Sequence, residues 1–141
     1  MRPFGKEWLS LRSNRRGSVM FEFALITPIF LTLLLTGLEY AFIMFSYSSM
    51  QQGTDFAARS ISVNTAAAAQ VQNLVRSKLP AWLQSSVAVT VVQSNTADPR
   101  QNTITVRSTA SANNATPIAI FSNVFPWTLT TNVVVVQELP F

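Results

Sequence analysis

The sequence predicts an α+β protein. A long N-terminal transmembrane helix continues as a helix beyond the lipid, and a second helix packs on a small antiparallel three-stranded sheet. Three patterns indicate this fold class: residues 23–38 carry no charge, apolar residues then recur every three or four positions, and the last third alternates apolar with polar residues. Charged residues make up only 11% of the chain, against roughly 25% in soluble proteins. The composition therefore favours a membrane protein.

The first 17 residues form a predicted basic leader peptide. They hold five basic side chains and one acidic side chain, a formal charge of +4, whereas residues 18–141 hold five of each sign. Because the excess charge belongs to the leader, we expect no nucleic-acid-binding surface on the rest of the chain. Basic residues beside a membrane span stay in the cytoplasm, which predicts an inside N-terminus. The basic residues nearest to the span are Arg12, Arg15 and Arg16.

Residues 18–46 form the predicted transmembrane helix. A helix over 21–45 would measure roughly 37 Å, and a bilayer core is about 30 Å thick. Ten of residues 23–38 are Leu, Ile or Phe, which favours insertion by about 5 kcal/mol, while Glu39 opposes it by about 2 to 3 kcal/mol. A secretory signal peptide is the alternative. The stretch is longer than the usual ~7–15 apolar residues of such a signal, and this favours a retained helix.

Two helical segments are expected before the sheet. The first continues past the lipid, because apolar residues recur at helical spacing at Ile43, Tyr47, Met50, Ala57 and Ile61. The second is predicted to begin after Thr65, a suitable N-cap residue, and to end at Pro80. Its apolar stripe consists of Val71, Leu74, Val75 and Leu79.

The remaining chain predicts strands and turns. Residues 87–91 and 103–107 alternate in the manner of half-buried strands, with a turn at Asp98-Pro99 between them. Thr116 followed by Pro117 predicts the N-cap of a short helical turn. Residues 127–139 predict a final strand, whose run of valines at 133–136 favours a central position buried on both faces. Residues 47–141 are therefore expected to form one folded head.

The residue types present exclude most catalytic chemistry. The chain has no cysteine and no histidine, so zinc sites, cysteine nucleophiles and histidine bases are not expected. Serine is plentiful, but no base is placed to activate it. We therefore expect a protein without catalytic residues, cofactor or metal, and an anchored hydrolase is disfavoured.

The junction between leader and span is the most informative stretch. The basic leader ends at Gly17, an apolar helix begins at Ser18, and a single acid, Glu22, precedes Phe23. A glycine lets an extended backbone enter a protease cleft that a Cβ would obstruct. Cleavage there would create an α-amino group that pairs with Glu22 of a neighbouring subunit. The alternative is that Glu22 is only an interfacial charge and the basic run only a topology signal.

With these features the chain resembles type IV pilin-like precursors, and among them the TadE-like pseudopilins of the tight-adherence (Tad/Flp) pilus system. The resemblance covers roughly residues 15–61. It is carried by Arg-Arg-Gly at 15–17, Glu22-Phe23-Ala24-Leu25, Pro28, Gly37-Leu38-Glu39-Tyr40, Met50-Gln51-Gln52 and Ala57-Ala58-Arg59. The abundant pilin of these systems has Glu-Tyr where this chain has Glu22-Phe23, which favours a pseudopilin over the main filament subunit.

The resemblance implies cleavage after Gly17 by a prepilin peptidase and a minor role in assembling a Tad/Flp pilus or related secretion apparatus used in adhesion. The implied partners are that peptidase, other pilin-like subunits, inner-membrane assembly proteins and membrane lipid. The implied location is the bacterial inner membrane, with a single span and a periplasmic head; entry into the filament, or secretion with it, stays open. The alternative function is an unprocessed membrane-anchored binding module in the periplasm.

Two further positions stay open between functional and structural interpretations. Glu39 lies within the predicted span, where it either pairs with a partner helix or extends its carboxylate to the interface. Pro28 either kinks the helix or is tolerated in a span. Trp82 and Trp127 are expected to be anchors in the core or on the head surface rather than a ligand cage.

Overall fold

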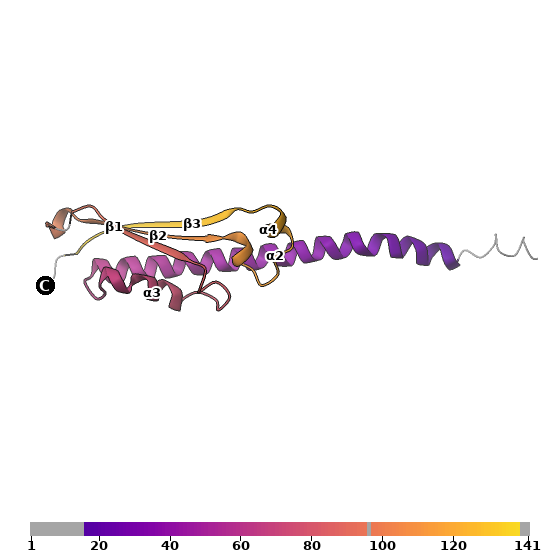
Figure 1. Ribbon diagram of the computed structural model, residues 1–141, viewed down its shortest axis with the longest axis horizontal. Helices are drawn as coiled ribbons and strands as arrows, with labels where there is room; N and C mark the ends of the chain where they lie inside the picture. The colour runs from indigo at the N-terminus through magenta and orange to yellow at the C-terminus, as the bar shows by residue number, and fades with distance from the viewer. Residues whose placement is uncertain (1–15, 96, 139–141) are drawn as a thin grey trace, which may run out of the picture. The chain divides into compact units, whose positions relative to one another are not determined.

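The computed structural model describes residues 16–95 and 97–138 (Figure 1). Its principal elements in chain order are α2 (Arg16–Ser62), α3 (Val71–Ser77), β1 (Ala88–Gln93), β2 (Thr103–Ser111), α4 (Phe121–Val124) and β3 (Thr128–Val136). The chain divides after Gly37 into two compact units. We call the second unit, which begins at Leu38, the head.

Helix α2 supplies the apolar segment that the sequence predicts. Its large apolar side chains from Val19 to Leu38 are exposed, and the helix is long and apolar enough to cross a membrane. The helix continues through Pro28. Thr27, Thr32 and Thr36 each donate a side-chain hydrogen bond to the carbonyl four residues earlier, at 2.6 to 2.8 Å. These hydroxyls are therefore satisfied within the helix itself, as an apolar environment requires.

The end of α2 corrects the expected role of Thr65. Asn64 adopts the left-handed conformation with φ of 58° and ends the helix. The Thr65 hydroxyl donates to the Ser60 carbonyl at 2.9 Å, so it binds the last turn of α2 and does not cap the next helix. The alanine run is only partly helical. A 3₁₀ turn covers Ala68–Gln70 before α3 begins at Val71.

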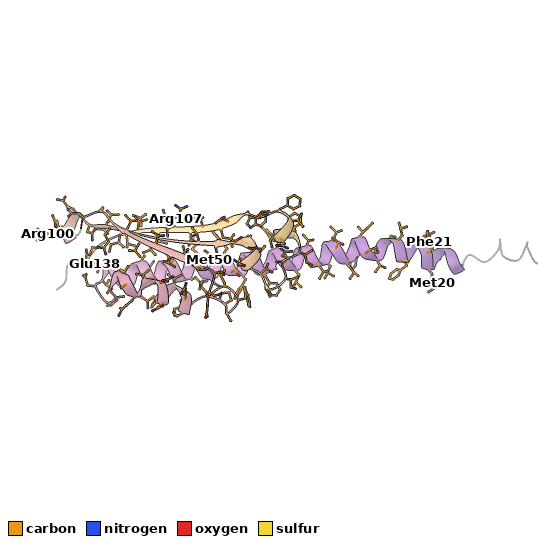
Figure 2. The ribbon with its side chains drawn as sticks, in the orientation of Figure 1. Met20, Phe21, Met50, Arg100, Arg107 and Glu138 are labelled. Atoms are coloured by element: carbon orange, nitrogen blue, oxygen red, sulfur yellow. The ribbon has the colours of Figure 1, made fainter. Side chains whose placement is uncertain are left out.

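The sheet confirms the predicted antiparallel three-stranded arrangement. Strand β2 lies between β1 and β3, with Val91 opposite Val106 and Val106 opposite Val133. The alternation expected for 103–107 is confirmed, because Ile104 and Val106 are buried whereas Arg107 is exposed. Figure 2 shows Met50 between α2 and the sheet and Arg107 on the opposite side of the sheet. One face therefore packs on helix and the other is open.

The predicted central position of the last strand is wrong. Strand β3 is an edge strand, because it pairs with β2 alone. Val133 and Val135 are half-buried on the inner face, whereas Val134 and Val136 are 56% and 61% exposed. Four successive valines suit an extended backbone in either position, since β-branched residues favour strands whether or not both faces are covered. The valine run predicted the strand and not its place in the sheet.

The core lies between the sheet and both α2 and α3. The core residues of the two helices are Ile43, Met50, Ala57, Ala58 and Ile61 from α2, and Val71 and Val75 from α3. A buried polar contact also joins α2 to the sheet. The Thr54 hydroxyl bonds to the Met50 carbonyl at 2.7 Å, to the Ser108 hydroxyl at 2.8 Å and to the Thr131 hydroxyl at 3.0 Å. Because Thr54 gives its one proton to the carbonyl, the other two hydroxyls donate to it, and its oxygen is fully satisfied.

Gly53 permits the close contact between α2 and α3. A Cβ at this position would lie 3.1 Å from the Val75 carbonyl oxygen and 3.4 Å from the Lys78 Cβ. At Gly37, also in α2, a Cβ would meet nothing within 4 Å. The sequence gives no reason to distinguish these two helical glycines. Packing against α3 leaves little room for a side chain at Gly53, whereas Gly37 has no such restriction.

We expect Gly53→Val to destabilise the head, because a branched side chain meets the α3 backbone. Overpacking of this kind costs about 1–3 kcal/mol, and each kcal/mol lowers the Tm of a domain of this size by about 4–8 °C. The measurement is thermal unfolding of the purified chain, followed by near-ultraviolet circular dichroism. Gly37→Val is the matched control and should leave the Tm of the head unchanged. Equal effects of the two variants would contradict the contact.

Candidate functional site

The leader junction lies at the start of α2. Arg12 and Arg15 fall outside the described residues, and α2 begins at Arg16. Gly17 lies in the first helical turn, and a Cβ added there would meet nothing within 4 Å. The backbone of Ser18 follows in the same turn. A side chain at position 17 therefore meets no obstacle within the protein, and any restriction on it would come from a partner.

Glu22 and Phe23 lie one turn further along, in the exposed part of α2. Phe23 is 72% exposed, and Glu22 is also exposed. Pro28 follows in an exposed part of the helix, and its carbonyl accepts the hydrogen bond from Thr32 at 2.8 Å. Up to Leu38 the helix therefore presents its side chains outward, in a form suited to contact with lipid or with other helices.

Glu39 is buried and accepts three backbone hydrogen bonds. Its side chain is only 1% exposed. One carboxylate oxygen accepts from the N–H groups of Ile120, at 3.1 Å, and Phe121, at 2.7 Å; the other accepts from Ser122 N–H at 2.8 Å. These donors lie at the N-terminus of α4, where N–H groups have no partner within the helix and the dipole favours a negative charge. Glu39 therefore caps α4 from another element, an arrangement that neither interpretation of the sequence included.

The local cap predicted at Thr116 is wrong. The Thr116 hydroxyl contacts the N–H and carbonyl of Ile118 at 3.1 and 3.0 Å, in a tight turn, and α4 begins only at Phe121. Ile120, the residue before α4, makes no side-chain cap. The sequence signal for the true cap is Glu39 itself, an acid that follows Gly37 and Leu38 in an apolar helix and has no basic residue near it in the sequence. That signal does not identify the donors, which lie more than 80 residues away.

A second buried polar contact lies one to two turns beyond Glu39. The Ser46 hydroxyl donates to the carbonyl of Ala115, and the Trp82 indole N–H lies 3.3 Å from both of these oxygens. The Trp82 ring packs edge-on against Phe42, with ring centroids 5.9 Å apart. Ser46 and Ala115 were not singled out in the sequence. Trp82 proves to be an anchor that joins α2 to two loops.

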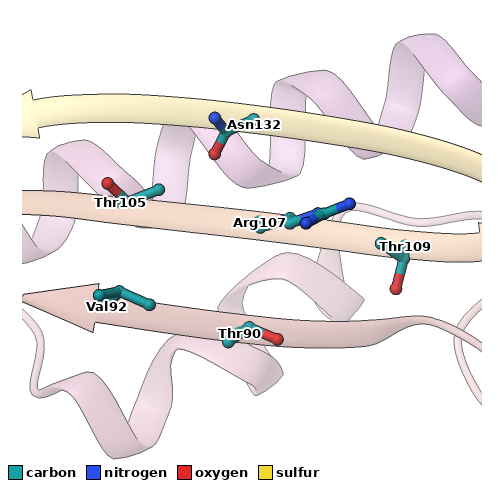
Figure 3. Close-up of a pocket in the computed structure, with 6 residues that line it drawn as sticks. All are labelled: Thr90, Val92, Thr105, Arg107, Thr109 and Asn132. Atoms are coloured by element: carbon teal, nitrogen blue, oxygen red, sulfur yellow. The ribbon is translucent and has the colours of Figure 1, made fainter.

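The open face of the sheet carries a shallow depression. Figure 3 shows side chains from all three strands around it. The lining residues are Thr90, Val92, Thr105, Arg107, Thr109 and Asn132. They provide hydroxyl and amide groups and one cation, without a carboxylate or a general base. Such a set can form hydrogen bonds to a partner and has no means of proton transfer near pH 7.

The chain carries a family signature along α2. Residues 17–59 match the family model described as TadE-like protein. This match confirms, for the matched segment, the resemblance that the sequence indicates. The matched segment begins at Gly17 and ends three residues before α2 ends at Ser62. The comparisons with curated proteins and with solved structures gave no significant match.

The TadE-like segment includes much of the core. It contains Ile43, Met50, Ala57 and Ala58, all buried in the head, together with Glu39 and Thr54. Among residues 16–95 and 97–138, no group of three or more acidic side chains is placed to hold a metal ion. The matched segment therefore contains core residues and the buried polar side chains of Glu39 and Thr54 on one helix. The strands that follow lie outside the match.

Proposed function

We propose that this chain is a minor pilin-like subunit, a pseudopilin, that is cleaved after Gly17 by a prepilin peptidase and supports assembly of a Tad pilus. The TadE-like match from Gly17 to Arg59 is the observation that carries the proposal. The match starts at the residue where the basic leader meets the apolar helix, so the junction and the family signature coincide. The proposed role requires no catalysis by the chain, and its proposed partners are the peptidase, other pilin-like subunits and inner-membrane assembly proteins.

The architecture of the head supports retention of α2. A secretory signal is removed after its apolar stretch, yet α2 from Glu39 to Ile61 forms one side of the core of the head. Loss of this segment would expose the inner face of the sheet, including Ile104 and Val106. Among the described residues, every member of that core lies beyond residue 17, from Ile43 onward. The proposed processing therefore leaves a chain that is able to fold.

The proposed orientation places the N-terminus in the cytoplasm and the head in the periplasm, anchored in the inner membrane. The +4 charge of residues 1–17 supports this direction. Alkaline phosphatase fused to the C-terminus is active only outside the cytoplasm, so the fusion should be active. An inactive but well-expressed fusion would reverse the orientation.

Processing is tested by the mass of the protein recovered from its native host. We expect a chain that begins at Ser18, so that the intact mass falls by the mass of residues 1–17. In Gly17→Leu the precursor should accumulate uncleaved, because a side chain at this position blocks the extended backbone in the protease cleft. Position 17 is open within the protein, so the loss of cleavage would not come from misfolding.

The control is Gly37→Leu, which changes another unrestricted glycine of α2 and should be processed normally. Recovery of the unmodified wild-type chain starting at Met1 would contradict the pseudopilin proposal and support the membrane-anchored binding module. A mature start beyond residue 60 would mean that α2 is removed as a signal sequence.

A further inference from the structure

Exposed apolar side chains occur in the head on the first turns of α2 after Gly37, in the loop after α3, and in and after α4. We call six of them the apolar collar: Tyr40 and Phe45 of α2, Trp82 of the loop after α3, Val124 of α4, and Phe125 and Trp127 between α4 and β3. They are between 37% and 68% exposed. Phe56, further along α2, is also exposed, but the Lys78 ammonium lies 4.8 Å from the centroid of its ring. Within the collar, the rings of Phe45 and Trp82 lie with their centroids 6.4 Å apart, and Phe125 packs on Phe121 of α4 with ring centroids 4.9 Å apart.

Hydrogen bonds fix the collar to the first turns of α2 within the head. The three bonds to Glu39 hold the start of α4, the short helix that carries Val124 and precedes Phe125, against α2. The Trp82 indole N–H is held by Ser46 and Ala115. The Trp127 carbonyl accepts from Ala112 N–H at 2.9 Å. The collar is thus built from loops that return to the same part of one helix.

The collar has no exposed charge from its own segments. Residues 79–97 and 108–137 contain no Asp, Glu, Lys or Arg. The charged residue next to Tyr40 in the sequence, Glu39, is buried and accepts three N–H bonds. The first backbone N–H groups of α4, which would otherwise need water, are satisfied by that carboxylate. This part of the head is therefore suited to a medium poorer in water than the periplasm.

An open apolar pocket of about 340 Å³ adjoins the collar. It is lined by Leu38, Ala41, Phe42 and Phe45 of α2 and by Trp82. Its walls are almost entirely hydrocarbon, and the polar edge of the Trp82 ring is already hydrogen-bonded within the protein. Such a pocket fits the methylene chain of a lipid better than any polar ligand.

We propose that the collar lies in the interfacial layer of the membrane, with the pocket taking part of a phospholipid acyl chain. This rests on the proposed anchoring by α2. The apolar stretch 19–38 that leads into the collar has about 20 residues and spans roughly 30 Å, the thickness of the hydrocarbon core. Trp and Tyr concentrate at membrane interfaces, because their rings are apolar and their N–H or O–H groups polar. The head then rests on the lipid through α4 and the Trp82 loop.

The test uses tryptophan fluorescence of the full chain in phosphatidylcholine vesicles. The chain has three tryptophans, of which Trp8 lies in the leader; Trp8→Phe leaves Trp82 and Trp127 as the only reporters. With bromine atoms near the glycerol end of the acyl chains, we expect both tryptophans to lose most of their emission, while aqueous iodide quenches weakly. Emission insensitive to brominated lipid and readily quenched by iodide would overturn the proposal, and would favour a protein partner for the collar.

Two controls separate this proposal from the anchoring on which it rests. A variant that combines Phe30→Trp with Trp8→Phe, Trp82→Phe and Trp127→Phe has one tryptophan, in the middle of the proposed span. Its emission should be quenched best by bromine near the methyl ends of the acyl chains. If that quenching is absent, or if the protein does not float with the vesicles, the proposed membrane anchoring by α2 is wrong. If Phe30→Trp is quenched and the collar tryptophans are not, only the collar proposal is wrong. Val124→Glu should weaken quenching of Trp127, whereas Val63→Glu, at an exposed apolar position directly after the end of α2, should not.

Discussion

Glu39→Gln is expected to destabilise the head by about 3 kcal/mol or more, because hydrogen bonds from N–H groups to a charged acceptor contribute about 1.5–3 kcal/mol each. The Glu39 carboxylate accepts three such bonds with its two oxygens. A glutamine offers one acceptor oxygen, and its NH₂ group would face a backbone N–H. The loss is a large share of the ~5–15 kcal/mol that stabilises a typical domain.

The measurements are the Tm of the head and hydrogen exchange at individual amides. We expect the Tm to fall by about 10 °C or more, and the amides of Ile120, Phe121 and Ser122 to exchange much faster than in the wild type. Loss of the cap should act first on α4 and on the adjoining Trp127. Glu22→Gln removes a charge from an exposed position of the same helix and should change stability by no more than about 0.5 kcal/mol. Continued protection of the three amides in Glu39→Gln would show that Glu39 does not cap α4.

Glu22→Ala is expected to abolish piliation, or to reduce it strongly, while the processed protein still accumulates in the membrane. As a simple anchor, the helix would insert better without this charge and function would not suffer. In the proposed pseudopilin, Glu22 pairs with the new α-amino group of a neighbouring subunit after cleavage. That pair contributes about 1 kcal/mol at an interface; its larger effect is to set the register between subunits.

The readouts are pilus counts by electron microscopy and the amount and mass of the mature chain in the membrane fraction. Glu22→Gln keeps the size of the side chain and removes its charge, so it should resemble Glu22→Ala if charge pairing matters. Glu22→Asp keeps the charge and should retain part of the piliation. Normal pilus numbers in Glu22→Ala would refute the pairing and strengthen the interpretation of α2 as an anchor alone.

Elements with a repeating local pattern were predictable from the sequence. The apolar run of α2, the alternation around Ile104 and the break between the two helical segments after Ile61 each correspond to structure near the expected residues. Helical and extended periodicity arise from neighbours a few positions apart, so a single sequence reports them well. The leader junction at Gly17, where the TadE-like match begins, stays a prediction.

Positions that depend on distant contacts were not predictable. Thr65 and Thr116 are good capping residues by type, but each hydroxyl bonds elsewhere in the folded chain. Glu39 was placed within the expected span, and in the structure its carboxylate caps a helix whose donors lie 81 to 83 residues later. Nothing in the local sequence of either segment specifies that pairing.

The sequence by itself determined a long apolar helix with a basic start, a small antiparallel sheet and a chain without cysteine or histidine. The tertiary structure decided that β3 is an edge strand, that Gly53 rather than Gly37 is restricted, and that Glu39 belongs to the head. The physical reason is the same in all three cases. Periodicity fixes the conformation of a segment, whereas burial and hydrogen-bond partners depend on which segments, distant in sequence, come into contact.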